Sequence, residues 1–250
     1  MSLSARFPSL KGRTVLVTGG ATGIGAQLVT DLANQDCQVA FIDLEEAEGQ
    51  ALAAVHDNAS FYPCDVTNVS ALQATIATIG ERHGEIRGLL NNVGNDTRHA
   101  VADVTEDFWR RCMAVNLDAA FFASQAVLSQ MQSAGGGSIV NVGSINALLG
   151  PENMVGYVTA KAGLMGMTRA MAREVGADGI RVNALLPGWV VTDRQLEKWL
   201  TPEAEAAWMA QVSIQRRLMP DDVSRLAQFL LADDSEMITG QTINVDGGRT

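Results

Sequence analysis

The sequence contains few cysteines, and those it has lie far apart. Only three of its 250 residues are cysteine, at Cys37, Cys64 and Cys112, and none forms a CxxC pair or a Cys/His group. This spacing argues against a disulfide framework and a zinc site and is typical of reduced thiols in a cytoplasmic protein. The three histidines are equally dispersed, so no metal site is predicted.

Basic residues are also scarce. The chain has 18 lysines and arginines against 28 aspartates and glutamates, a formal net charge of −10. A field of this sign repels a phosphate backbone, so no nucleic-acid partner is expected. No apolar run approaches the roughly 18 uncharged residues that a membrane helix needs. Met1–Lys11 has no apolar signal-peptide region, so we expect no membrane partner, no export and a cytoplasmic location.

Hydrophobic residues make up 47% of the chain without a biased tract or linker, which predicts one globular domain over residues 1–250. Apolar runs alternate with stretches of helical spacing. This alternation predicts a doubly wound α/β fold, a parallel sheet of about seven strands with helices on both faces and ligands at the carboxyl ends. Residues 192–219 are expected to form a helical insertion that covers the site. The expected strands are Arg13–Thr18, Cys37–Ile42, Ser60–Pro63, Gly88–Asn91, Ser138–Val142, Ile180–Leu185 and Thr242–Val245.

A glycine-rich turn follows the first expected strand. Residues Thr18–Gly25 read TGGATGIG and lead into a stretch of helical spacing. Gly19, Gly23 and Gly25 let the backbone turn tightly and approach a pyrophosphate, whose charge would lie at the helix N-terminus. The spacing is wider than the six-residue dinucleotide fingerprint, and a plain structural turn is the alternative. The position between a strand and an amphipathic helix favours dinucleotide binding.

Asp43 ends the second strand, 18 residues after Gly25. A carboxylate there can bind both ribose hydroxyls of the adenosine half and repel a 2′-phosphate. At about 4 Å and an effective dielectric near 20, one such charge pair costs on the order of 4 kcal/mol, roughly a thousandfold in binding. Thr22 supplies no compensating positive charge. NAD rather than NADP is therefore the predicted cofactor; the alternative for Asp43 is a solvated carboxylate at a strand end.

Four polar residues form the candidate catalytic group. Tyr157 and Lys161, in YVTAK, share one face of an expected helix that runs to about Gly176. A free tyrosine titrates near 10, and an adjacent cation is expected to lower that pKa by roughly 1 to 3 units and make the phenol a usable base. Ser144 follows a strand and can hydrogen-bond the reacting oxygen. Asn116 could anchor a water that relays protons towards Lys161.

Together these motifs resemble the short-chain dehydrogenase/reductase family over essentially the whole chain. Asn91–Gly94 is similar to the family's NNAG, with Val93 in place of the usual alanine, and Pro187-Gly188 is similar to its PG turn. The resemblance implies a Rossmann-type fold, a nicotinamide cofactor, and Asn116, Ser144, Tyr157 and Lys161 as a catalytic tetrad in which the tyrosine exchanges a proton with the substrate oxygen. The cofactor-binding residues that it implies are Gly19, Thr22, Gly23, Ile24, Gly25, Asp43, Leu44, Asp65, Val66, Asn92, Gly94, Tyr157, Lys161, Pro187, Gly188, Val190 and Thr192.

Two further segments resemble those of bacterial aldose 1-dehydrogenases, which oxidise the anomeric hydroxyl of a cyclic sugar to a lactone. They are Asn95–His99 (NDTRH) and Thr192–Glu203. A sugar needs several hydrogen-bonding groups and an aromatic or apolar surface. The alternative is that both segments are solvated surface or subunit contacts. The expected substrate-binding residues are Asn95, Asp96, Ser144, Asn146, Glu152, Tyr157, Trp189, Gln195 and Trp199.

Three other functional classes are the alternatives to this one. A 3-oxoacyl-thioester reductase is disfavoured by Asp43, because that group usually takes NADPH. A polyol or other secondary-alcohol dehydrogenase stays open. A nucleotide-sensing or scaffold protein that had lost the chemistry would be favoured by loss of Tyr157 or Lys161, and both are present. The family resemblance also implies a dimer or tetramer, with Asp118–Ser133 and Met154–Gly176 as the candidate interface helices.

Overall fold

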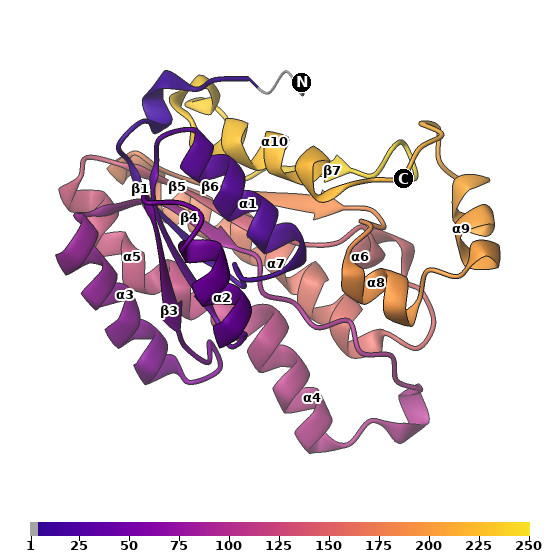
Figure 1. Cartoon of the computed structure of the whole chain (residues 1–250). Helices are drawn as coiled ribbons and strands as arrows, with labels where there is room; N and C mark the ends of the chain where they lie inside the picture. The colour runs from indigo at the N-terminus through magenta and orange to yellow at the C-terminus, as the bar shows by residue number, and fades with distance from the viewer. Residues whose placement is uncertain (1–4) are drawn as a thin grey trace.

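The computed structural model describes residues 5–250. Its centre is one seven-stranded sheet in the order β3-β2-β1-β4-β5-β6-β7, and every neighbouring pair is parallel (Figure 1). This is the doubly wound arrangement that the sequence predicts, with the order reversing between β1 and β4. The strands are β1 (Thr14–Thr18), β2 (Gln38–Asp43), β3 (Ala59–Pro63), β4 (Ile86–Asn91), β5 (Gly137–Val142), β6 (Ile180–Pro187) and β7 (Thr242–Val245).

Helices cover both faces of the sheet. On one face α1 packs against α10, and on the other face lie α3, α5 and α7. The first group is α1 (Gly23–Asn34) and α10 (Pro220–Leu231); the second is α3 (Val69–His83), α5 (Ala119–Ser133) and α7 (Val155–Val175). The remaining helices are α2 (Glu46–Ala53), α4 (Glu106–Met113), α6 (Asn146–Leu149), α8 (Asp193–Lys198) and α9 (Pro202–Met209).

The residues of β1 show why the strands are apolar throughout. Val15 and Val17 belong to the core beneath α1 and α10, whereas Leu16 belongs to the core beneath α3 and α5. Successive side chains of a strand point to opposite faces. Because helices cover both faces, both sets of side chains are removed from water, and an alternating polar pattern would bury unpaired groups.

One helical stretch needs a correction to the sequence-based expectation. Within the described residues, Glu106–Ser133 is a helix long and apolar enough, by length and composition, to cross a membrane. The expectation that no segment approaches this composition was therefore too strict. Its α5 portion packs against β4 and α3 and places Ala123, Val127 and Met131 in the core. The apolar residues of α5 thus cover the sheet. The expectation about Met1–Lys11 falls partly outside the described residues.

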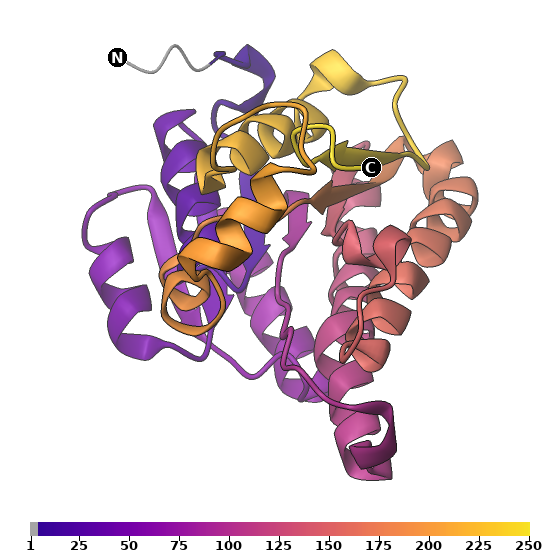
Figure 2. The same ribbon diagram turned by 90° about the vertical axis from the view of Figure 1, so that its right-hand side faces the viewer.

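Residues 192–219 contain the two short helices α8 and α9. Each begins with a threonine cap: the Thr192 side chain accepts from the Gln195 amide, and the Thr201 side chain accepts from the Ala204 amide. Both helices lie beyond one end of the sheet in Figure 1, and Figure 2, turned to face that side, shows them in front of it. Their position is at the edge where a doubly wound sheet binds its ligands.

Candidate active site

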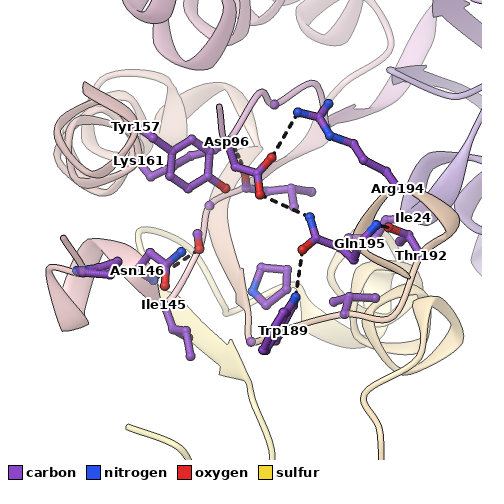
Figure 3. A pocket seen from close by; sticks show the side chains of 18 of the residues that line it. Ile24, Asp96, Ile145, Asn146, Tyr157, Lys161, Trp189, Thr192, Arg194 and Gln195 are labelled. Atoms are coloured by element: carbon purple, nitrogen blue, oxygen red, sulfur yellow. Dashed lines mark hydrogen bonds and ion pairs between the residues drawn. The ribbon is translucent and has the colours of Figure 1, made fainter. Parts of the chain in front are cut away.

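A cavity of about 380 Å³ opens at the carboxyl edge of the sheet (Figure 3). Its wall combines the turn into α1, the segments after β4, β5 and β6, and the first turns of α7 and α8. Residues predicted separately for the cofactor, for catalysis and for the substrate therefore meet in one space. Those that line it are Ile24, Asn92, Gly94, Asp96, Ser144, Asn146, Tyr157, Lys161, Pro187, Gly188, Trp189, Val190, Thr192 and Gln195.

The glycine turn forms a close-fitting backbone cradle. Gly19 and Gly23 have φ values of +68° and +56°, the left-handed region that favours glycine. At Gly25 a Cβ atom would lie 1.8 Å from the carbonyl oxygen of Gly19, so a larger residue cannot fit. The Asn92 side-chain Nδ2 donates to that same oxygen at 2.8 Å. The glycines and Asn92 therefore hold a tight turn directly before the N-terminus of α1.

Asp43 lies beside this turn. Its Oδ2 accepts from the Ala21 amide at 2.9 Å, and its Oδ1 accepts from the Leu44 amide at 2.7 Å. Leu44 is 66% exposed although it is apolar. After the neighbouring strand β3, Val66 is buried and Asp65 is exposed, with its carboxylate accepting from Thr67. These four residues lie at the ends of β2 and β3 or directly after them, and none of them lines the cavity.

The catalytic candidates Ser144, Tyr157 and Lys161 lie together in the cavity. The Ser144 hydroxyl is hydrogen-bonded to the Tyr157 phenol. Lys161 is buried, donates to the carbonyl oxygen of Val142 at 2.9 Å, and places its Nζ 5.7 Å from the centre of the tyrosine ring. One turn of α7 separates the two residues in sequence, which is why they share a face.

The pKa of Tyr157 corrects the sequence-based expectation. Burial raises the pKa of Tyr157 to about 12, although the hydrogen bond from Ser144 opposes this change. Burial also lowers the pKa of Lys161 to about 8, so the charged ammonium form of Lys161 is less favoured than in water. Removal from water is the largest cause of both pKa shifts, and Lys161 is not among the groups that shift the pKa of the phenol. The prediction that Lys161 brings the phenol into range was wrong for the free protein, because sequence spacing does not report burial.

Asn116 is held in a π-helical turn, Ala114–Asp118, between α4 and α5. Such turns often occur at functional sites. Its Oδ1 accepts from the Asn95 amide at 2.8 Å, and its Nδ2 donates to the carbonyl oxygen of Cys112 at 3.0 Å. A Cβ on Gly94 would lie 3.3 Å from Lys161 Nζ and 3.6 Å from Asn116 Oδ1. Asn116 therefore braces the loop that separates it from Lys161.

A polar network crosses the mouth of the cavity. The Asp96 carboxylate accepts from Arg194 Nη2 and from Gln195 Nε2, each at 3.1 Å. Gln195 Oε1 in turn accepts from the indole nitrogen of Trp189 at 2.8 Å. Figure 3 shows the Asp96 carboxylate between Tyr157 and the two side chains of α8. The network thus connects the loop after β4 to the insertion, over the tyrosine.

The structure places three expected substrate residues away from the cavity wall. The Asn95 side chain accepts from Thr97 of its own loop and from Arg194 of α8, and Glu152 is exposed. Trp199 packs under the Arg98 guanidinium, 5.1 Å from its ring centre. Conversely, the wall contains Arg98, Pro151, Arg194 and Trp208, which sequence reasoning did not assign. Arg98 and Arg194 lie within the two segments that it singled out, so that signal was present.

Comparison with known proteins agrees with this geometry. A family model described as enoyl-(acyl carrier protein) reductase matches residues 19–250. D-xylose 1-dehydrogenase of Caulobacter vibrioides is 45% identical over 249 residues, covering 98% of both chains.

The chain belongs to the short-chain dehydrogenase/reductase family. A probable galactose dehydrogenase of Rhizobium meliloti is 42% identical over 250 residues, again covering 98% of both chains. The crystal structure of a putative short-chain alcohol dehydrogenase from Sinorhizobium meliloti superposes with a TM-score of 0.92 at 32% identity, covering 97% of this chain and 98% of that one. The protein is thus an oxidoreductase that acts on CH–OH donors with a nicotinamide cofactor.

The short-chain dehydrogenase cradle fits such a cofactor. No side chain caps the N-terminus of α1, and its first turn contains no acidic residue, so its free N–H groups are suited to a pyrophosphate. Leu44, directly after β2, offers an exposed apolar surface of the kind that an adenine ring covers. A Cβ on Gly23 would lie 3.3 Å from Thr192, so the insertion contacts the cradle at its first residue.

Lys161 gives this dehydrogenase a testable dependence of stability on pH. Its folded-state pKa of about 8 lies below the ordinary 10.5, so between these pH values the unfolded chain binds a proton that the folded protein has released. The free energy of unfolding therefore rises with pH across this window, and below it the buried charge costs about 3 kcal/mol. We expect the difference in urea-unfolding free energy between the wild type and Lys161→Met to change by this amount from pH 7 to pH 10.

The exposed Lys11 provides the control, because Lys11→Met should keep the same offset from the wild type at both pH values. An offset for Lys161→Met that does not change with pH would contradict the lowered pKa.

Proposed function

We propose that the protein is an NAD-dependent aldose 1-dehydrogenase. The observation that carries the proposal is the set of polar side chains, Asp96, Asn146 and Gln195, gathered around Tyr157 in a cavity of about 380 Å³. A sugar requires several directed hydrogen-bond partners, and Trp189 offers the flat apolar surface that its ring can contact. The named relatives that act on xylose and galactose support the same substrate class.

When bound, the nicotinamide ring would supply the hydride acceptor for the anomeric carbon of the sugar. The hydroxyl proton passes to the phenolate oxygen of Tyr157, which becomes a neutral phenol. The Ser144 hydroxyl donates to the substrate oxygen and holds it at the phenol. Lys161 lies beside the tyrosine and favours the phenolate while it is charged. The product is a lactone.

NAD is proposed over NADP because of Asp43. Its carboxylate is fixed beside the glycine turn by the amides of Ala21 and Leu44. A second negative charge at that point would be repelled, whereas two ribose hydroxyls can donate to it. The same residue argues against a 3-oxoacyl-thioester reductase, and the polar wall around Asp96 is poorly suited to an acyl chain.

The test is the absorbance of reduced nicotinamide, followed while the purified protein meets NAD or NADP with a panel of D- and L-aldoses. We expect one or two sugars to reduce NAD rapidly. Lack of turnover with every sugar, together with turnover of another secondary alcohol or polyol, would overturn the aldose proposal and leave the oxidoreductase assignment in place.

Asp96→Asn is predicted to weaken sugar binding. It removes the charge from an acceptor that faces the cavity and leaves Arg194 without its ion-pair partner at 3.1 Å. Hydrogen bonds to a charged acceptor contribute about 1.5–3 kcal/mol, so we expect the KM for the sugar to rise roughly tenfold or more while the KM for NAD stays constant. Asp193→Asn, at an exposed position on α8, is the matched control. An unchanged sugar KM in Asp96→Asn would contradict the assignment.

We also propose a cytoplasmic homo-oligomer, a dimer or tetramer, whose subunits meet through α5 and α7. Phe121 on α5 and Val155 on α7 are apolar yet 39% and 37% exposed. Gly166, on the same long helix α7, has open space where a side chain would be, which permits close approach of a second helix. The molar mass in solution, measured by light scattering, tests this arrangement.

A further inference from the structure

The N-terminus of the catalytic helix α7 is capped by a side chain from a distant segment. Met154 occupies the cap position and makes no side-chain cap hydrogen bond. Instead, His99 Nε2 accepts from the Gly156 amide at 3.1 Å, across 57 residues of sequence. Gly156 is the second residue of α7 and directly precedes Tyr157. The amide that would otherwise lack a partner is thus satisfied by an imidazole.

The remaining contacts of His99 determine which ring nitrogen carries the proton. Nδ1 lies 3.0 Å from the carbonyl oxygen of Thr97, which can only accept. Nδ1 must therefore donate, and Nε2, which faces an N–H group, must accept. This is the neutral form of histidine with its proton on Nδ1. The ring is also fixed by Phe108, whose centre is 4.6 Å away.

The backbone of the same segment is joined to the residues before α7. The His99 amide donates to the carbonyl oxygen of Asn153 at 2.7 Å, and Arg98 contacts the sulfur of Met154. The NDTRH segment also supplies Asp96 and Arg98 to the cavity wall. One short segment therefore lines the cavity and holds the start of the helix that carries Tyr157.

We propose that His99 is a positioning residue: its neutral imidazole caps the first turn of α7 and holds Tyr157 in place, and protonation of the ring releases that turn. This inference rests on the proposed role of Tyr157 as the acid/base. It concerns where the phenol lies, and it assigns His99 no contact with the substrate.

Protonation of His99 would turn this attractive contact into a repulsive one. An imidazolium would present an N–H at Nε2 to the N–H of Gly156, two donors face to face, and a positive charge at the positive end of the helix. Histidine is the side chain whose charge changes between about pH 5 and 8. The ionisable groups on the elements around the ring are Asp96 and Arg98 on its own segment, Glu106, Asp107, Arg110, Arg111 and Cys112 on α4, and Tyr157 and Lys161 in the first two turns of α7.

The experiment compares two substitutions at one position. His99→Gln carries a neutral oxygen acceptor at a similar reach, whereas His99→Phe keeps an aromatic ring against Phe108 and removes the acceptor. Misplacement of a reacting group by about 1 Å can cost a hundredfold in rate. We expect His99→Phe to lower kcat by about tenfold to a hundredfold with an unchanged Kd for NADH, and His99→Gln to recover most of that loss.

The pH profile separates positioning from general packing. Protonation of Tyr157 alone makes log kcat for oxidation fall with a slope of one as pH decreases. In the wild type, protonation of His99 is expected to add to that of Tyr157, so the slope of log kcat against pH on the acid side becomes steeper than one. In His99→Gln we expect this slope to return to one. His56→Gln, outside the cavity wall, is the control and should keep the steep limb.

Wild-type kcat in His99→Phe, or an unchanged steep limb in His99→Gln, would overturn the proposal. If His99→Phe does not fold, the pH profile of His99→Gln decides alone. Near-normal turnover in Tyr157→Phe would instead refute the acid/base role on which the inference rests, so the two failures are distinguishable.

Discussion

Tyr157→Phe is expected to reduce kcat for sugar oxidation by about a thousandfold while the Kd for NADH stays within a few-fold of the wild type. A positioned acid/base group contributes roughly a hundredfold to ten-thousandfold to a rate, and here the phenol lines the cavity and is the hydrogen-bond partner of Ser144. The substitution removes one oxygen and keeps the ring, so the packing of α7 and the contact with Lys161 should persist. Steady-state kinetics and fluorescence titration with NADH measure the two quantities.

The chain provides its own control, because it has two tyrosines. Tyr62, on β3, hydrogen-bonds His83 at 2.7 Å and lies outside the cavity wall. Tyr62→Phe removes the same oxygen and should leave kcat unchanged. Retention of more than about a tenth of wild-type kcat by Tyr157→Phe would show that another group moves the proton.

Asp43→Asn is expected to shift cofactor preference towards NADP by a factor of about a hundred to a thousand in the ratio of kcat/KM values. The repulsion between the carboxylate and a 2′-phosphate at about 4 Å amounts to roughly 4 kcal/mol at an effective dielectric near 20, and part of that is lost to screening by salt. Asparagine keeps one oxygen that can accept from the Ala21 amide, so the glycine turn should retain its support.

The measurement is kcat/KM for NAD and NADP with one sugar at saturation. Asp57→Asn, at an exposed site after α2, is the control. It changes the net charge of the protein by the same one unit and should not alter the ratio. If the ratio in Asp43→Asn equals that of the wild type, the carboxylate does not discriminate between the cofactors and is a solvated strand end.

The sheet and its covering helices could be predicted because their signals are local. Each strand has a short apolar run ending in a turn, and β7 has the predicted bounds, Thr242–Val245. The predicted start of the second strand at Cys37 was one residue early, since the strand begins at Gln38. The glycine turn and the Tyr157–Lys161 pair were also readable, because the spacing along one segment fixes their geometry.

What could not be predicted depends on contacts between distant segments. The Arg194–Asp96 pair spans 98 residues and the His99 cap spans 57, and no periodicity signals either of them. Trp199 was chosen over Trp208 although both lie in the insertion, because the orientation of a short helix is set by what it packs on. The raised pKa of Tyr157 was missed for a related reason: it follows from burial by residues of several elements.

The hydrogen bonds across the cavity mouth have a consequence for selectivity. In the described structure Asp96 is already satisfied by Arg194 and Gln195, and Trp189 is satisfied by Gln195. A molecule that enters must therefore offer better partners than the protein offers itself. A polyhydroxylated ring can exchange hydrogen bonds one for one, whereas a hydrocarbon of the same size would strand charged and polar groups without partners. We therefore expect the cavity to discriminate against apolar alcohols of the same size.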